Sequence, residues 1–209
     1  MVVALMVAGL AAEIVAWRVT ASRRLGVWLV MGSLFAALGL LVVLARPPLL
    51  SKDVAASTAA AAGLASGLIL YLATRLAVGV LRRWEPFDRH VGESYAMGGD
   101  VSAALAFFVG VCVVAVGEEL FWRGLFLFRL VRVAGRVAGS GLGWAAYVAA
   151  NLPSGNLAIV AGAVVGGALW TALAFWSHGV LASVLSHGVW TGLMVSFPVV
   201  RPSAPGSAR

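Results

Sequence analysis

Charged residues are scarce in this chain. They make up 11% of its 209 residues, whereas hydrophobic residues make up 62%. Soluble domains carry about 25% charged residues, so this scarcity excludes a sizeable soluble domain. The apolar runs approach or exceed the length of about 20 residues that a helix needs to cross a bilayer. The sequence therefore predicts an all-α fold, a polytopic bundle of about seven transmembrane helices.

Cysteine is almost absent, and acidic residues are few. The single cysteine, Cys112, excludes an intramolecular disulfide and a zinc site built from cysteines. The net charge of +7 comes almost entirely from arginines near the ends of the apolar runs. No basic run is interleaved with aromatic residues, so nucleic acid is not an expected partner. Membrane lipids, through their anionic headgroups, are an expected partner.

The apolar runs and their breaks predict where the helices lie. Membrane segments are expected at 1–17, 27–45, 54–81, 100–128, 142–152, 157–176 and 179–197. Residues 82–100 form the only long polar connection. Their mixture of tryptophan, phenylalanine and arginine is typical of a segment at the membrane interface, where His90 is expected to be solvated. The distribution of arginines favours an outside N-terminus and an inside C-terminus, although the arginines at 129, 132 and 136 oppose this orientation.

Two adjacent carboxylates and an arginine stand inside one apolar run. Glu118, Glu119 and Arg123 fall within six residues of each other. Each such charge costs roughly 2.5–3.5 kcal/mol at the centre of a membrane helix, which points to a functional site. Glu119 and Arg123 share a helix face with the acid N-terminal to the base, so they are predicted to pair. Glu118 remains as a free carboxylate and a candidate general base.

A purely structural role for this cluster stays open at this point, with the Glu–Arg pair locking two helices together. Two further polar stripes favour a site. Tyr147 and Asn151 are four residues apart on one predicted helix face, and Ser183, His187 and Thr191 follow the same spacing on the last helix. Asparagine and threonine often hydrogen-bond between membrane helices, whereas imidazole can donate, accept or bind a metal.

Together these motifs resemble the CPBP family. Its signature is Glu-Glu-x-x-x-Arg on one span, Phe-x-x-x-His about thirty residues later and His-x-x-x-Asn on a late span. The first motif is complete here as residues 118–123, and 147–151 and 187–191 occupy the places of the other two. The family comprises CAAX proteases and bacteriocin-processing (Abi) intramembrane proteases, including Rce1-type prenyl endopeptidases. The resemblance covers roughly residues 100–195.

The resemblance implies a role for each matching residue. Glu118 would be the base that activates water, and Arg123 would orient the acidic pair formed with Glu119. His187 would stabilise the oxyanion or bind a metal. Two positions depart from the family: Asn151 stands in place of a histidine and cannot accept a proton, and Thr191 stands in place of an asparagine and has a shorter reach.

The resemblance also sets expectations for cofactor, substrate and location. A divalent metal such as zinc is one option, with Glu118 and His187 as candidate ligands, but only one histidine remains on the motif helices. The substrate would be a membrane-associated or lipidated peptide or protein. The expected location is a prokaryotic plasma membrane. Residues 1–99 would form the N-terminal spans and interfacial loop, 100–197 the CPBP-like catalytic core, and 198–209 a disordered tail.

The sequence is therefore consistent with three functions. The favoured one is an intramembrane endopeptidase of the metalloprotease-like CAAX type that uses Glu118. The second is an inactive relative that binds the same kind of segment as an immunity or scaffold protein, which Asn151 and Thr191 favour. The third is a small transporter or proton relay through Glu118, Glu119 and His187, although the chain shows no internal repeat of the kind common in transporters.

Overall fold

The chain folds into helices. The computed structural model describes residues 2–45, 48–99 and 101–200, and these residues contain no strand. The helical elements are α1 (Val2–Ala21), α2 (Val27–Ala45), α3 (Ala56–Leu81), α4 (Glu85–Met97), α5 (Ala103–Phe108), η1 (Val109–Ala115), α6 (Val116–Glu119), η2 (Leu120–Leu127), α7 (Phe128–Ala134), α8 (Arg136–Asn151), η3 (Leu152–Ser154), α9 (Leu157–Ser177) and α10 (Leu181–Ser196). The predicted all-α fold is confirmed.

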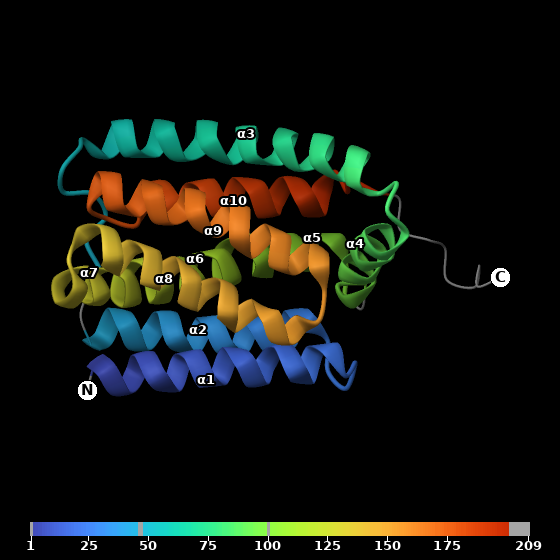
Figure 1. The fold of residues 1–209 in the computed structure, drawn as a ribbon, viewed down its shortest axis with the longest axis horizontal. Helices are drawn as coiled ribbons and strands as arrows, with labels where there is room; N and C mark the ends of the chain where they lie inside the picture. Colours follow the sequence, from blue (N-terminus) through green and yellow to red (C-terminus); the bar gives the residue numbers. More distant parts are fainter. Residues whose placement is uncertain (1, 46–47, 100, 201–209) are drawn as a thin grey trace.

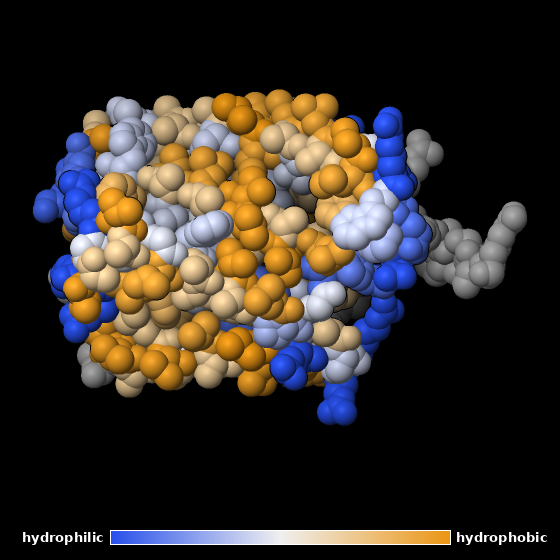
Figure 2. Space-filling view, in the orientation of Figure 1, coloured by the Kyte–Doolittle hydropathy of each residue, from blue (hydrophilic) through white to orange (hydrophobic). Residues whose placement is uncertain are grey.

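The long helices lie side by side in one bundle (Figure 1). Within the described residues, five segments are long and apolar enough to cross a membrane: α1, α2, α3, α9 and the continuous run Ala103–Ala134. The shorter apolar helix α10 packs along α3, and α8 packs between α7 and α9, which brings the number of crossing segments to about seven. On the face shown in Figure 2, hydrophobic residues cover most of the middle and hydrophilic residues gather at the two ends. The chain is an integral membrane protein.

Several predicted boundaries differ from the structure. Helix α1 ends at Ala21 and not at residue 17, and the fourth crossing segment ends at Ala134 and not at residue 128. The connection at 82–100 contains the helix α4, which begins with a proline in its first turn and lies at one end of the bundle (Figure 1). Helix α8 starts at Arg136, well before the predicted residue 142. Gly135 adopts a φ of 81°, which glycine tolerates without a steric penalty, so the chain turns directly from α7 into α8.

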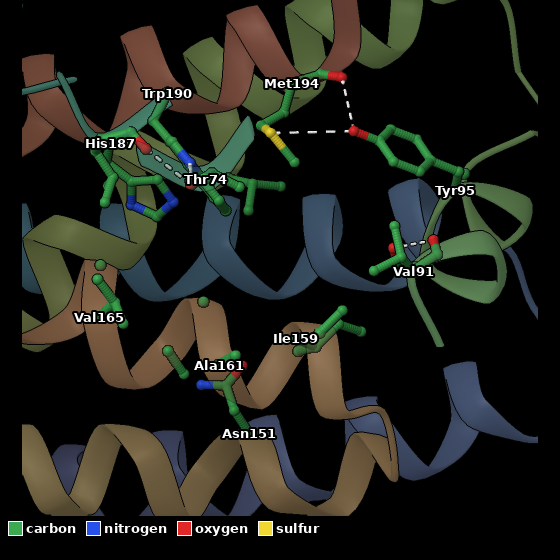
Figure 3. Close-up of a pocket in the computed structure, with 18 of the residues that line it drawn as sticks. Thr74, Val91, Tyr95, Asn151, Ile159, Ala161, Val165, His187, Trp190 and Met194 are labelled. Carbon is green, nitrogen blue, oxygen red and sulfur yellow. Dashed lines mark hydrogen bonds between the residues drawn. The ribbon is translucent and has the colours of Figure 1, made fainter. Parts of the chain in front are cut away.

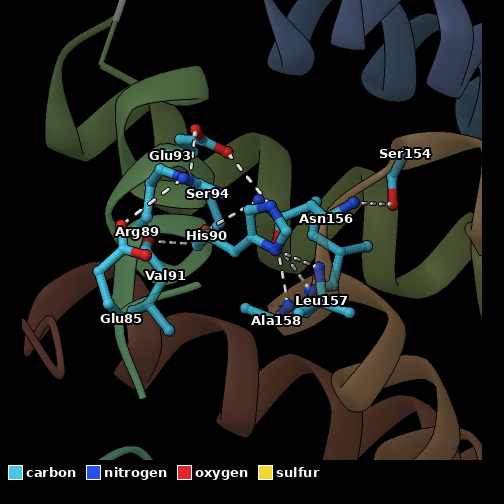
Figure 4. Close-up of polar contacts among 11 residues, drawn as sticks. Glu85, Arg89, His90, Val91, Glu93, Ser94, Ser154, Asn156, Leu157 and Ala158 are labelled. Atoms are coloured by element: carbon cyan, nitrogen blue, oxygen red, sulfur yellow. Dashed lines mark hydrogen bonds and ion pairs between the residues drawn. The ribbon is translucent and has the colours of Figure 1, made fainter. Parts of the chain in front are cut away.

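His90 is not merely solvated, so that expectation was wrong. Its Nδ1 accepts a hydrogen bond of 3.1 Å from the backbone N–H of Leu157, the first residue of α9. Its carbonyl oxygen accepts a bond of 2.8 Å from the side-chain amide of Asn156, and Figure 4 shows the imidazole facing this turn. The first backbone N–H groups of a helix lack acceptors within the helix. His90 of α4 supplies an acceptor for one of these groups at the start of α9. These contacts fix α4 against the start of α9.

The side chain of Asn156 caps α9, and this cap is expected to contribute more to the free energy of unfolding than the cap that Ser102 provides for α5. The Oδ1 of Asn156 accepts hydrogen bonds from the backbone N–H groups of Ala158 and Ile159, at 3.0 and 3.2 Å, and the side chain is buried. Asn156→Ala is expected to lower the free energy of unfolding by about 0.5–2 kcal/mol, measured by denaturation in mixed micelles. Ser102→Ala is the matched control, because Ser102 caps α5 with one bond of 3.3 Å in an exposed setting. An equal loss in both variants would contradict this ranking.

Helices α3 and α10 approach each other through glycine. A β-carbon on Gly67 would lie 2.6 Å from the carbonyl oxygen of Ser186, and one on Gly63 would lie 2.6 Å from that of Ala182. Small residues spaced in this way let membrane helices pack closely. The glycines thereby hold α10, which carries His187, against α3.

Gly67→Ala is expected to destabilise the bundle by about 1–3 kcal/mol, because the added methyl group forces the two backbones apart. Gly79 lies on the same helix with no atom within 4 Å of an added β-carbon. Gly79→Ala should therefore be neutral or stabilise by up to about 1 kcal/mol, since alanine favours helix more than glycine. Unfolding in mixed micelles measures both variants, and equal stability of the two would argue against close packing at Gly67.

Some sequence predictions fall outside the described residues. They are the start of the fourth segment at residue 100 and the part of the predicted tail from 201 onward. The described part of the fourth segment begins with a cap: the Oγ of Ser102 accepts a hydrogen bond from the Leu105 N–H at the start of α5. The division of the chain at residue 99 and the orientation in the membrane stay predictions.

Candidate active site

The acidic pair lies at an irregular point of the fourth crossing segment. Glu118 and Glu119 belong to α6, a single α-helical turn between the π-helical stretches η1 and η2. π-Helical turns inside α-helices occur frequently at functional sites. Both carboxylates are buried, with exposed fractions of 8% and 0%. The neighbouring Gly117 lets the turn press against α2, because a β-carbon there would lie 2.1 Å from the carbonyl oxygen of Phe35.

Glu119 joins three helical elements through one oxygen. Its Oε1 accepts hydrogen bonds from Arg123 Nη1 at 2.9 Å and from His187 Nδ1 at 3.0 Å. The predicted Glu119–Arg123 pair is therefore present. Because the paired carboxylate only accepts, Nδ1 of His187 carries a hydrogen, and the ring presents Nε2 away from Glu119. Glu119 thus orients His187.

Aromatic rings and a backbone carbonyl complete this buried network. Arg123 Nη2 donates to the carbonyl oxygen of Gly167 at 3.1 Å, and the guanidinium carbon lies 4.3 Å from the centre of the Tyr147 ring. The indole of Trp170 stacks on the His187 imidazole with ring centres 3.7 Å apart and planes inclined by 13°. A cation–π contact such as that between Arg123 and Tyr147 is stronger where water is excluded. The network fixes both Arg123 and His187 in position.

Glu118 faces a cavity instead of this network. The cavity has a volume of about 480 Å³. Its polar lining residues include Glu118, Tyr147, Asn151 and His187, and apolar side chains form most of its remaining wall. Figure 3 shows lining residues from several helices, with His187 and Tyr95 towards opposite ends of the view. An apolar cavity with a few convergent polar groups is the usual form of a ligand or active site.

Helix α4 closes the far end of the cavity. The Tyr95 hydroxyl donates to the carbonyl oxygen of Met194 at 3.4 Å and accepts from the N–H of Val199 at 3.1 Å. Burial raises the pKa of this hydroxyl above its ordinary value, so Tyr95 stays neutral at physiological pH. The segment predicted to lie at the interface therefore also forms one wall of the cavity.

Asn151 contacts a residue that the sequence motifs do not include. Its Nδ2 donates to the carbonyl oxygen of Tyr147 at 2.9 Å and to Glu13 Oε1 at 3.4 Å. Glu13 comes from α1, is 1% exposed, and its Oε2 accepts a hydrogen bond of 2.9 Å from Trp122 Nε1. Glu13 also lines the cavity. One signal could have identified it: Glu13 is the only charged residue in its predicted span, and such residues are functional by default.

The structure brings together most of the predicted site residues. Glu118, Asn151 and His187 line the cavity, and Glu119 and Arg123 lie directly behind His187. Thr191 is not among the lining residues of this cavity.

Ser183 and Thr191, the two hydroxyl residues of the stripe on α10, make contacts outside the cavity. The Thr191 methyl group lies beside Gly110, and the Ser183 hydroxyl donates to the carbonyl oxygen of Val180. Four residues advance about 40° beyond one helical turn, so Ser183 and Thr191 lie on opposite sides of His187 along α10 and meet different neighbours.

The side chains around the cavity offer few ligands for a metal ion. Among residues 2–45, 48–99 and 101–200, no three histidine, cysteine or acidic side chains are placed to share one ion. Zinc sites use three or four protein ligands, whereas the candidate ligands Glu118 and His187 supply two. Glu118 and His187 alone therefore do not fit such a site.

The segment that carries most of the site residues resembles a known protein family. The family model described as Type II CAAX prenyl endopeptidase Rce1-like matches residues 100–193. The match confirms the resemblance predicted from the motifs, and its range includes Glu118, Asn151 and His187. No curated protein and no solved structure matches the chain. The matched range begins after α4 and therefore does not include Glu13.

Proposed function

We propose that this chain hydrolyses a peptide bond of a membrane-associated substrate, because residues 100–193 match the family model of Rce1-like CAAX prenyl endopeptidases. The observation that supports the proposal best is the division of labour between the two glutamates. Glu119 is bound by Arg123 and His187, whereas Glu118 lines the cavity beside His187. One carboxylate therefore orients the imidazole, and the other is available to a water molecule.

The reaction uses Glu118 as general base. Its carboxylate takes a proton from water while the water oxygen bonds to the scissile carbonyl carbon. The protonated His187, held by Glu119 through Nδ1, donates from Nε2 to the oxygen on which negative charge develops. The C–N bond then breaks, and the nitrogen takes the proton held by Glu118. The products are a carboxylic acid and an amine, and both side chains return to their starting state.

The cavity supports an apolar substrate. Its wall contains aromatic and aliphatic side chains, among them Trp28, Phe35, Leu70, Phe87, Trp170 and Trp190. Burying apolar surface yields about 25 cal/mol per Å², so a lipid chain gains affinity in this space. We therefore assign a prenylated C-terminal segment as the substrate, with the lipid in the apolar part and the peptide bond beside Glu118.

Peptide cleavage by the purified protein in lipid vesicles tests this function. Quenched-fluorescence peptides are supplied with and without a prenyl thioether at their C-terminal cysteine. The expected result is cleavage of the prenylated peptide at a higher kcat/KM than its unmodified counterpart. Equal rates would contradict the assigned lipid site, and cleavage of neither peptide would contradict the proposed activity.

A further inference from the structure

A second carboxylate enters the cavity from outside the family-matched segment. Glu13 lies on α1, and it lines the same cavity as Glu118, Asn151 and His187. Its side chain is 1% exposed. A buried carboxylate in a membrane helix is costly unless it has partners or a role. The proposed reaction, as derived above, does not use it.

The hydrogen bonds of Glu13 define what it can do. Its Oε2 accepts from Trp122 Nε1 at 2.9 Å, and its Oε1 accepts from Asn151 Nδ2 at 3.4 Å. The orientation of the Asn151 amide is fixed, because the same Nδ2 donates to the Tyr147 carbonyl oxygen at 2.9 Å. Each carboxylate oxygen has two lone pairs, so both oxygens of Glu13 can accept a further hydrogen bond. Glu13 is therefore a positioned proton acceptor that touches the asparagine.

Asn151 is the position where the chain departs from the histidine of the motif it resembles. Asparagine cannot take up a proton, but it donates a hydrogen bond to a group that can. We propose that Glu13 is a second acid–base group of the active site and replaces the proton acceptor that Asn151 cannot provide. This inference rests on the proposed function.

Glu13 acts on the same water molecule as Glu118. Glu118 takes one proton of the water and later gives it to the leaving nitrogen. Glu13 accepts a hydrogen bond from the other hydrogen, which turns the oxygen lone pair towards the carbonyl carbon. When the acid product forms, Glu13 takes this second proton and releases it to solvent as the product leaves. The products are then a carboxylate and an amine, and no further reactant is needed.

Three variants in the vesicle cleavage assay test the inference. Glu13→Gln keeps the size and an oxygen acceptor but removes the acid–base group, and it is expected to lower kcat by about 10²–10⁴-fold. Adding Asn151→His to the Glu13→Gln variant is expected to raise kcat at least tenfold above that of Glu13→Gln alone, because the histidine supplies an imidazole at the same place. The pH profile of kcat/KM should change between wild type and the double variant, since a carboxyl group is exchanged for an imidazole. Glu85→Gln, on an exposed side chain of α4, is the matched control.

The outcomes separate the two proposals. Cleavage by wild type and by Glu13→Gln at equal rates, with Glu118→Gln inactive, would overturn the role of Glu13 and leave the protease function standing. Loss of activity in Glu13→Gln without recovery by Asn151→His, and with an unchanged pH profile, would reduce Glu13 to a structural contact of Trp122. An inactive wild type that gains activity from Asn151→His alone would show that Glu13 does not replace the histidine. An inactive wild type that no variant activates would overturn the protease function and this inference with it.

Discussion

Glu118→Gln is expected to lower kcat for peptide cleavage by about 10²–10⁴-fold, because the amide cannot take a proton from water. The substitution keeps the size of a side chain that lines the cavity at 8% exposure. KM should change little, since the lipid part of the substrate is bound elsewhere in the cavity. Steady-state cleavage of the prenylated peptide in vesicles measures both constants.

Two controls accompany this measurement. Glu85→Gln replaces an exposed glutamate of α4 and should leave kcat unchanged. Thermal unfolding of Glu118→Gln should match that of wild type, because Glu118 stands outside the Arg123 network. A variant that folds normally and cleaves at the wild-type rate would remove Glu118 from the mechanism.

Arg123→Met is expected to lower the free energy of unfolding by about 3–5 kcal/mol, the usual cost of leaving one partner of a buried ion pair alone. Arg123 is 1% exposed and bonds both Glu119 and the Gly167 carbonyl oxygen. Removing the guanidinium leaves the buried Glu119 carboxylate without the arginine that neutralises it. Unfolding in mixed micelles, with tryptophan fluorescence as the signal, measures the loss.

Arg123→Lys separates charge from geometry. Lysine restores the positive charge but has no planar fork to reach Glu119 and Gly167 together, so it should recover only part of the stability. Arg89→Met is the control for a surface pair, because Arg89 meets Glu85 and Glu93 at 3.5 and 3.9 Å with its side chain more than half exposed. Exposed pairs contribute little, so this variant should unfold like wild type. Equal losses in Arg123→Met and Arg89→Met would contradict the structural role of the buried network.

The sequence alone determined the class of the molecule and the first half of its site. Long apolar runs can satisfy their backbone groups in a membrane only as helices, so composition and run length were enough to predict the bundle. The second helix was placed at its observed bounds, 27–45. The Glu119–Arg123 pair was also predictable, because its partners are four residues apart on one helix and their contact depends on local geometry.

Only the tertiary structure decided which groups share the cavity. Glu13 and Asn151 are 138 residues apart, and no local periodicity relates residues on separate helices. The same holds for His187, which bonds Glu119 from another helix, and for His90, which caps a distant helix. Thr191 keeps the spacing of its motif, yet its methyl group packs beside Gly110 and its side chain does not line the cavity. Local spacing fixes which residues share a helix face, whereas the packing of helices fixes what that face meets.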